Sequence, residues 1–196
     1  MGNLLAETAG ILISIIVALL IVDRYVEQQK EQQWAKVRKL TYEAIAAHLS
    51  DAITDMFIYF PVKDHRPMTP IIEGWDHPNP ATVTGMTNLS SQLSQLPSAV
   101  SREKSTSDLA VEYYEAVKWD FDQIRDVLTP RVVQSSNDQT LINALVEFDN
   151  ARLKLNNAII AHKRVVTHSV FPNVIELLEQ AKTLYATMCE SWARTS

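Results

Sequence analysis

The sequence is poor in glycine and cysteine, and both shortages exclude classes of function. Its 196 residues include four glycines, at positions 2, 10, 74 and 85. These lie too far apart to form a P-loop or a dinucleotide-binding fingerprint, so only a nucleotide site built in some other way remains open. The single cysteine, Cys189, has no second cysteine in the chain for a disulfide bond, which suits a reducing compartment.

A concentrated block of charge is also missing. The formal net charge of -5 is spread along the chain, and no basic stretch has the density typical of a nucleic-acid-binding face. We therefore expect no nucleic-acid partner. The hydrophobic fraction of 46% and the charged fraction of 21% are those of a folded protein, and the length fits one domain beside a short anchor.

Glycine and proline are both absent from residues 11–60, and Pro61 is the first residue that would end a helix there. Within this stretch the segment from Leu4 to Val22 has Glu7 as its only charge, which predicts a transmembrane helix of just sufficient length. The rival interpretation is a cleaved signal peptide, but the basic start and the small-residue cleavage site are both missing. The predicted membrane positions include Leu4, Ile11, Ile15, Leu19 and Val22.

Basic residues follow the apolar segment closely, and none precedes it. By the positive-inside rule, this asymmetry predicts a single-pass protein of the cell inner membrane whose C-terminal domain is cytoplasmic. The residues concerned are Arg24, Lys30, Lys36, Arg38 and Lys39.

The N-terminal pattern has three parts: E-x-x-G-I from Glu7 to Ile11, the sequence D-R at Asp23, and E-x-x-W ending at Trp34. Over about the first forty residues it resembles the N-terminus of uncharacterised small bacterial and archaeal single-pass membrane proteins. The resemblance implies a cytoplasmic helical domain on a signal anchor, and it carries no known activity.

The spacing of apolar residues predicts an all-α fold, in which a membrane anchor (residues 1–23) continues into a cytoplasmic four-helix bundle. Residues 24–60 form the juxtamembrane helix and first bundle helix, and residues 108–196 the other three. Between them, residues 61–107 read as a Pro- and Ser-rich loop with one short helix at Leu89, Leu93 and Leu96, and with disorder from Ser98 to Ser107. Ser107 is expected to cap the second helix and Pro130 to end or kink it.

The loop contains two Asp-His pairs, Asp64 with His65 and Asp76 with His77. Carboxylate and imidazole together can bind a metal or share a proton. The spacing matches no established ligand motif, however, and Asp and His are ordinary turn residues in a Pro-rich loop. We therefore expect no cofactor.

Arg152 lies within the apolar stripe of the third bundle helix, where a charge needs a partner. The simplest expectation is a salt bridge to the second helix, for example to Asp120 or Glu112. The alternative is an anion-binding site that Arg152 forms with Lys154, His162 or Arg164. His48 and His162 lie near apolar faces as well, where each is expected to be hydrogen-bonded to a neighbour rather than to share a metal.

No catalytic motif is present, so the leading hypothesis is a membrane-tethered interaction or scaffold module rather than an enzyme. Its partners would be the lipid bilayer and either a second copy or another membrane or cytoplasmic protein. The second hypothesis is a ligand-responsive membrane sensor or effector that binds a small anion in the bundle, and the third is an enzyme that uses the Asp-His loop. Predicted interaction residues are Trp34, Val37, Leu40, Trp119 and Trp192.

Overall fold

The computed structural model describes residues 2–62, 78–96, 105–165 and 169–195, and for residues 2–15 and 195 only the helical backbone. In these ranges the chain is helical and contains no strand, which confirms the prediction of an all-α protein. The contacts divide the chain into two units, residues 1–37 and residues 38–196, which are described separately below.

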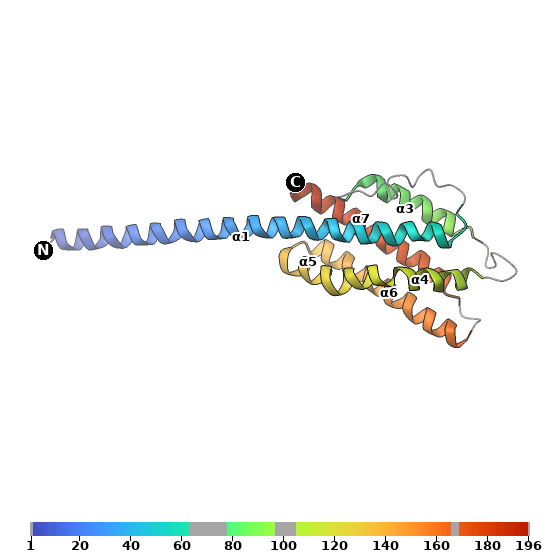
Figure 1. The fold of residues 1–196 in the computed structure, drawn as a ribbon. Coiled ribbons are helices and arrows are strands. Elements are labelled where there is room, and N and C mark those ends of the chain that lie inside the picture. Colours follow the sequence, from blue (N-terminus) through green and yellow to red (C-terminus); the bar gives the residue numbers. More distant parts are fainter. Residues whose placement is uncertain (1, 63–77, 97–104, 166–168, 196) are drawn as a thin grey trace. The chain divides into compact units, whose positions relative to one another are not determined.

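Helix α1 runs from Gly2 to Tyr59 and contributes to both units (Figure 1). Its length follows from the absence of helix-breaking residues between Ile11 and Phe60. In the second unit, α1 buries the apolar face that its spacing predicts, at steps of three and four residues. The buried side chains include Tyr42, Ile45, Leu49, Ile53 and Met56.

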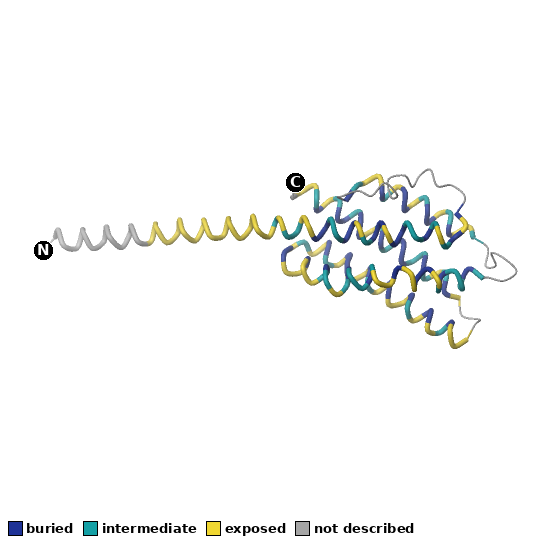
Figure 2. Tube along the Cα trace, in the orientation of Figure 1, coloured by how far each residue is buried: buried dark blue, intermediate teal, exposed yellow. Residues whose placement is uncertain are grey.

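The remaining helices of the second unit surround one hydrophobic core (Figures 1 and 2). Helix α7 contacts α6, α3 and α4, and α6 also contacts α4 and α5. The core has a strong aromatic component, because Phe121 packs edge-on against Phe148 and Phe60 lies against Tyr113. The bounds are α3 (Pro80–Leu93), α4 (Thr106–Gln123), the π-helix η2 (Ile124–Leu128), α5 (Thr129–Ser135), α6 (Gln139–Arg164) and α7 (Phe171–Thr195).

Helix α4 begins two residues earlier than the sequence predicts, because its cap is Ser105 and not Ser107. The backbone N–H of Asp108 donates to the Ser105 hydroxyl (3.2 Å), and the Ser105 backbone N–H donates to the Asp108 carboxylate (2.9 Å). This reciprocal capping box satisfies two N–H groups that a helix start otherwise leaves unpaired. Ser107 has a different role, since its hydroxyl accepts a hydrogen bond from the N–H of Val170 (3.1 Å).

Pro130 does not end the second helix, which continues to Ser135. The π-helical turn η2 directly precedes it. Its wider hydrogen-bond spacing accommodates a residue without an N–H group and relieves the clash between a proline ring and the preceding turn. The carbonyl of Ile124 accepts the backbone N–H of Thr129, five residues later, and also a hydrogen bond from the Thr129 hydroxyl (2.9 Å).

The expected loop over residues 61–107 contains the 14-residue helix α3, which is longer than the short helix predicted there. Its start is well specified: Pro80 occupies the first turn, and the Asn79 side chain accepts a hydrogen bond from the N–H of Ala81 (2.9 Å). Met86, Leu89 and Leu93 are buried against the core. Of the predicted disordered segment, residues 98–104 lie outside the described residues.

Candidate functional site

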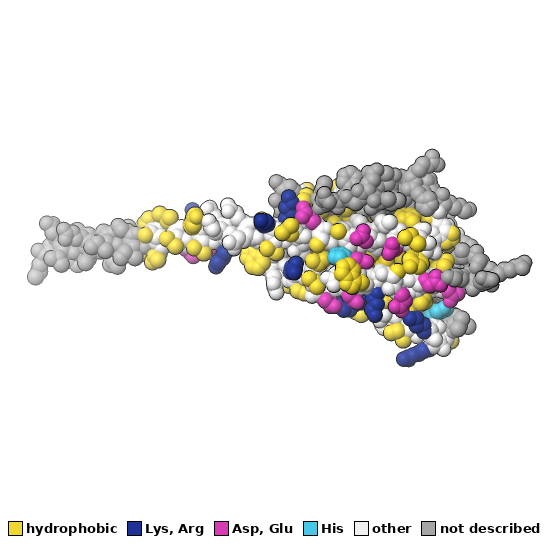
Figure 3. Space-filling view, viewed as in Figure 1, with side chains coloured by type: hydrophobic (Ala, Val, Ile, Leu, Met, Phe, Trp, Pro, Cys, Tyr) yellow, Lys and Arg dark blue, Asp and Glu magenta, His cyan; other side chains and the backbone are white. Residues whose placement is uncertain are grey.

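The first candidate surface is the apolar part of α1 in the first unit. From Ile16 to Val22 every described residue is exposed, and the exposed fraction of Leu19 is 64% (Figures 2 and 3). Seven consecutive positions cover all sides of an α-helix. A helix that is apolar all round is normally buried in protein or in lipid.

The described part of the chain holds no helix that is both long enough and apolar enough to span a membrane. Of the predicted membrane positions, Leu19 and Val22 belong to the exposed apolar surface. Leu4, Ile11 and Ile15 lie among residues whose side chains are outside the description.

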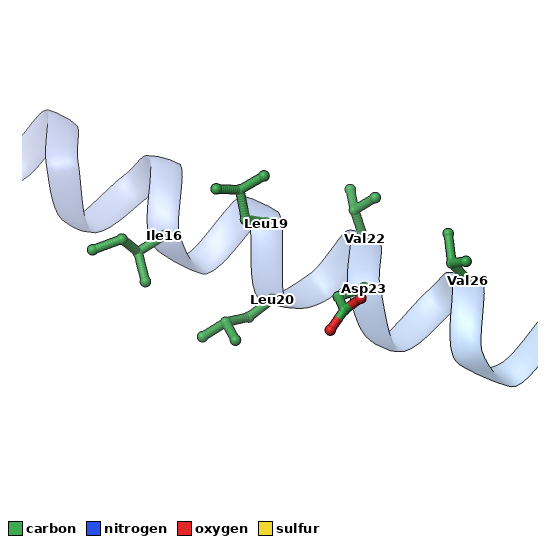
Figure 4. A pocket seen from close by; sticks show the side chains of 6 residues that line it. All are labelled: Ile16, Leu19, Leu20, Val22, Asp23 and Val26. Atoms are coloured by element: carbon green, nitrogen blue, oxygen red, sulfur yellow. The ribbon is translucent and has the colours of Figure 1, made fainter.

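A hollow of about 430 Å³ lies beside this stretch, lined by side chains from Ile16 to Val26. Figure 4 shows that these side chains project from α1 alone and that no second element closes the space. A ligand pocket encloses its ligand on several sides. The hollow is therefore the open surface between side chains of one helix, not a binding cavity.

The second candidate is Arg152 on α6, whose side chain is 4% exposed. Its Nε donates a 2.8 Å hydrogen bond to Asp149, three residues earlier, and its Nη1 lies 3.7 Å from Asp122 of α4. The predicted structural salt bridge to the second helix is therefore present, but the partner there is Asp122 rather than Asp120 or Glu112. Two carboxylates compensate the buried guanidinium charge.

Two polar atoms beside this pair are buried and make no hydrogen bond of standard geometry among the described residues. They are Nη2 of Arg152 and the hydroxyl of Tyr114. Burial raises the pKa of Tyr114, and the charge of Arg152 together with a side-chain hydrogen bond from it partly offsets that effect, so the two groups lie close enough for a weak mutual contact. Orphaned buried groups carry a desolvation cost of about 1–3 kcal/mol each, and they are where a small ligand or a water can bind.

The other residues predicted to join Arg152 are not assembled around it. His162 lies ten residues later on α6, about 15 Å along the helix axis, where its Nε2 lies 3.3 Å from Asp108. Lys154 points to the outside and pairs with Glu176 of α7 (2.5 Å). Arg164 is exposed at the last position of α6.

His48 is paired with a carboxylate, as expected for a histidine near an apolar face. Its Nδ1 lies 2.8 Å from Asp120 of α4, and the ring packs edge-on against Trp119 with centroids 5.3 Å apart. His162 has its own aspartate, so the two histidines do not share a site. Over the described ranges, no group of three or more His, Cys, Asp or Glu side chains could hold a metal ion.

The two Asp-His pairs of the predicted loop, Asp64 with His65 and Asp76 with His77, lie outside the described residues. Cys189 is half-buried on α7, and burial raises the pKa of its thiol to about 11. Because the thiolate is the nucleophilic form, a raised pKa lowers the reactivity of this cysteine at neutral pH.

The predicted interaction residues differ in exposure. In the first unit, Trp34 is 41% exposed and Val37 is half-buried. In the second unit, Leu40 and Trp119 are well exposed, at 56% and 63%. Trp192 packs against the core instead, with the Lys39 ammonium 5.3 Å from its ring centroid.

A further exposed apolar set was missed in the sequence, on the outer side of α6 at Val146, Leu153 and Ile160. Residues of the core stripe, such as Leu145 and Ile159, lie next to members of this set in the sequence, so the stronger periodicity of the stripe conceals it. The signal that identifies it is the constant interval of seven residues.

Compared with family models, with curated proteins and with solved structures, the chain shows no match to any of the three. Its function is therefore inferred from its own residues.

Proposed function

We propose that this protein is a single-pass membrane protein whose helical domain lies on the cytoplasmic side and assembles with a protein partner. The segment from Leu4 to Val22 crosses the bilayer. The second part of α1, together with α4, α6 and α7, forms a four-helix bundle to which α3 is added. The protein acts as an interaction or scaffold module and not as an enzyme.

The observation that carries this proposal is the apolar surface around α1 between Ile16 and Val22, which no other described part of the chain covers. Full burial of a Val, Leu or Ile side chain is worth about 1.5–3 kcal/mol, and the Val, Leu and Ile side chains of this segment forfeit a good part of it while they are exposed to water. Lipid removes this cost, and the basic residues from Arg24 to Lys39 then favour the cytoplasmic side.

Assembly with a protein partner is supported by large apolar side chains that remain exposed in the second unit. Leu40 and Trp119 expose more than half of their surface. Exposed tryptophan is enriched in the centres of protein interfaces, where it contributes much of the binding energy. These residues therefore supply contacts beyond what the core requires.

Membrane fractionation of the full-length protein tests the anchor. Ile16→Arg places a charge in the proposed span at a cost of about 3 kcal/mol, and should move the protein from the alkali-resistant membrane fraction to the soluble fraction. Leu40→Arg is the matched control, because Leu40 lies on the same helix and is equally exposed, at 56% against 55% for Ile16. The proposal fails if the unaltered protein is soluble, or if the two variants fractionate alike.

A second candidate function is a ligand-responsive membrane effector that binds a small anion at Arg152. The unpartnered Nη2 of Arg152 and hydroxyl of Tyr114 support it. It predicts that inorganic phosphate raises the melting temperature of the full-length protein in detergent, and that Arg152→Met removes the increase. Equal stabilisation of both proteins would contradict it.

A further inference from the structure

Helix α6 has an outer side that is neither charged nor buried. Val146, Leu153 and Ile160 expose 50%, 42% and 43% of their surface and are spaced seven residues apart. Phe148, Leu155 and Ile159 are buried on the opposite, core side of the same helix. In Figure 2 exposed and buried positions alternate along α6 accordingly.

Three asparagines complete this outer side at the same interval. Asn143, Asn150 and Asn157 are exposed, and each lies three residues before one of the apolar side chains and four after the previous one. Alternating steps of three and four define a heptad seam with asparagine at the a positions and an aliphatic residue at the d positions. These six residues, between 143 and 160, are called the α6 seam below.

The α6 seam differs from an ordinary solvated helix face, which carries lysine and glutamate. Charges appear only beside it. Asp149 falls at a g position and Lys154 at the following e position, and both are accessible, with side chains 32% and 59% exposed. In a parallel two-stranded coiled coil, a g residue faces the e residue five positions later on the other helix. Within one chain Asp149 pairs with Arg152 and Lys154 pairs with Glu176. The two flanking charges are still of opposite sign at positions that face each other between two copies of this helix.

We propose that the α6 seam is the contact surface for a second copy of this chain, with the two α6 helices parallel and in register. Each asparagine then meets the same asparagine of the second copy and can exchange side-chain hydrogen bonds with it. Each aliphatic residue meets its own counterpart, and Asp149 lies near Lys154 of the second copy. This deepens the proposed function, on which it rests, by naming the partner and the surface.

The pairing is weak by itself, because asparagine at an a position fixes register at the expense of stability and the seam spans less than three heptads. Anchoring in one bilayer compensates for this weakness. Two chains confined to the same membrane meet at a high effective concentration, which converts a weak contact into a populated one.

Cysteine cross-linking of the full-length protein in its membrane tests the pairing. In a Cys189→Ala background, single variants Val146→Cys, Leu153→Cys and Ile160→Cys are treated with a mild oxidant. All three should form disulfide-linked dimers, because a parallel, in-register pair brings each d position close to the same position of the second copy. A disulfide can bridge two Cα atoms that are up to about 7 Å apart. Val133→Cys on α5 is the matched control, since Val133 is equally exposed at 51% and lies outside the seam.

Three results would overturn the pairing. Dimers at Leu153→Cys alone indicate antiparallel helices, and equal cross-linking at all four positions indicates random collision. Membrane-bound protein without any seam dimer also overturns it and leaves the proposed anchor intact. A protein absent from the membrane fraction overturns the proposed function instead.

A charge placed within the α6 seam tests the proposed contact independently. Leu153→Glu places two like charges opposite each other in the dimer, where they repel. It should lower the cross-linked fraction at Val146→Cys by roughly tenfold, a change that corresponds to ~1.4 kcal/mol, while the protein stays in the membrane fraction. An unchanged cross-linked fraction contradicts the proposed contact.

Discussion

The guanidinium of Arg152 donates a 2.8 Å hydrogen bond to Asp149 within the same helix, and it reaches Asp122 of α4 as well. A charge in the core is thereby held between two carboxylates that are themselves each 32% exposed. Its third nitrogen, Nη2, makes no hydrogen bond of standard geometry among the described residues.

This arrangement predicts different effects for two substitutions of Arg152. Arg152→Ala removes the ion pairs and leaves a cavity, so it should lower the free energy of unfolding by about 2–4 kcal/mol. Arg152→Met fills most of the volume and removes the orphaned donor, so it should be nearly neutral or stabilising. Urea unfolding of the full-length protein in detergent measures both, and equal destabilisation would contradict this account of the pair.

The surroundings of Asp55 predict that the stability of the protein depends on pH. Burial raises its pKa above the ordinary value, and the neighbouring carboxylates of Asp120 and Asp51 add to the effect. An acid whose folded pKa is raised stabilises the protein when it is protonated, and this contribution is lost as the pH rises through the folded pKa. Asp55→Asn should therefore raise the melting temperature at pH 7, and the gain should shrink toward pH 3.

Asp51→Asn is the matched control for Asp55, because Asp51 is exposed one turn earlier on the same helix. Thermal unfolding between pH 3 and pH 7 compares the two variants with the unaltered protein. A larger gain from Asp51→Asn, or a gain from Asp55→Asn that increases as the pH falls, would be inconsistent with burial of the Asp55 carboxyl.

The two tryptophans of the second unit should behave differently. Trp192 packs against the core beneath Lys39, so Trp192→Ala should lower the free energy of unfolding by about 2 kcal/mol. Trp119 is 63% exposed and loses only its edge contact with His48, so Trp119→Ala should cost about 0.5 kcal/mol. Chemical unfolding of both variants provides the comparison, and the reverse order would refute the assignment.

Replacing the central asparagine of the α6 seam should strengthen the association of the two copies. Asn150→Ile replaces a polar a position with an aliphatic one, which strengthens two-stranded pairing by removing the desolvation of the amides. The cross-linked fraction at Leu153→Cys should therefore rise in this background. A fall would indicate that the Asn150 side chain lies outside the contact.

The sequence predicts the helices of the second unit well where periodicity is strong. The core stripe of α6 follows from such a local pattern. The course of the chain past Pro130 does not, because the π-helical turn that accommodates it depends on carbonyl positions that no residue pattern encodes. Helix α3 was underestimated since its exposed side is rich in Ser and Thr, and its helical state depends on packing against α7.

At the candidate site around Arg152, too, one part could be predicted from the sequence and another could not. That Arg152 needs an acidic partner could be inferred from its place in an apolar stripe, but the choice of Asp122 over Asp120 depends on the rotation of α4 against α6. Asp120 lies two residues before Asp122 and faces α1 instead, where it pairs with His48. Such choices are determined by tertiary packing.

The central claim is that α1 anchors the chain in a membrane with the helical domain on the cytoplasmic side. Labelling of single cysteines with a membrane-impermeant maleimide tests it directly, in a Cys189→Ala background that removes the one native cysteine. In intact cells, Asn3→Cys should be labelled, and Val133→Cys should be labelled only after lysis. Labelling of Val133→Cys in intact cells, or of neither position until lysis, would contradict the claim.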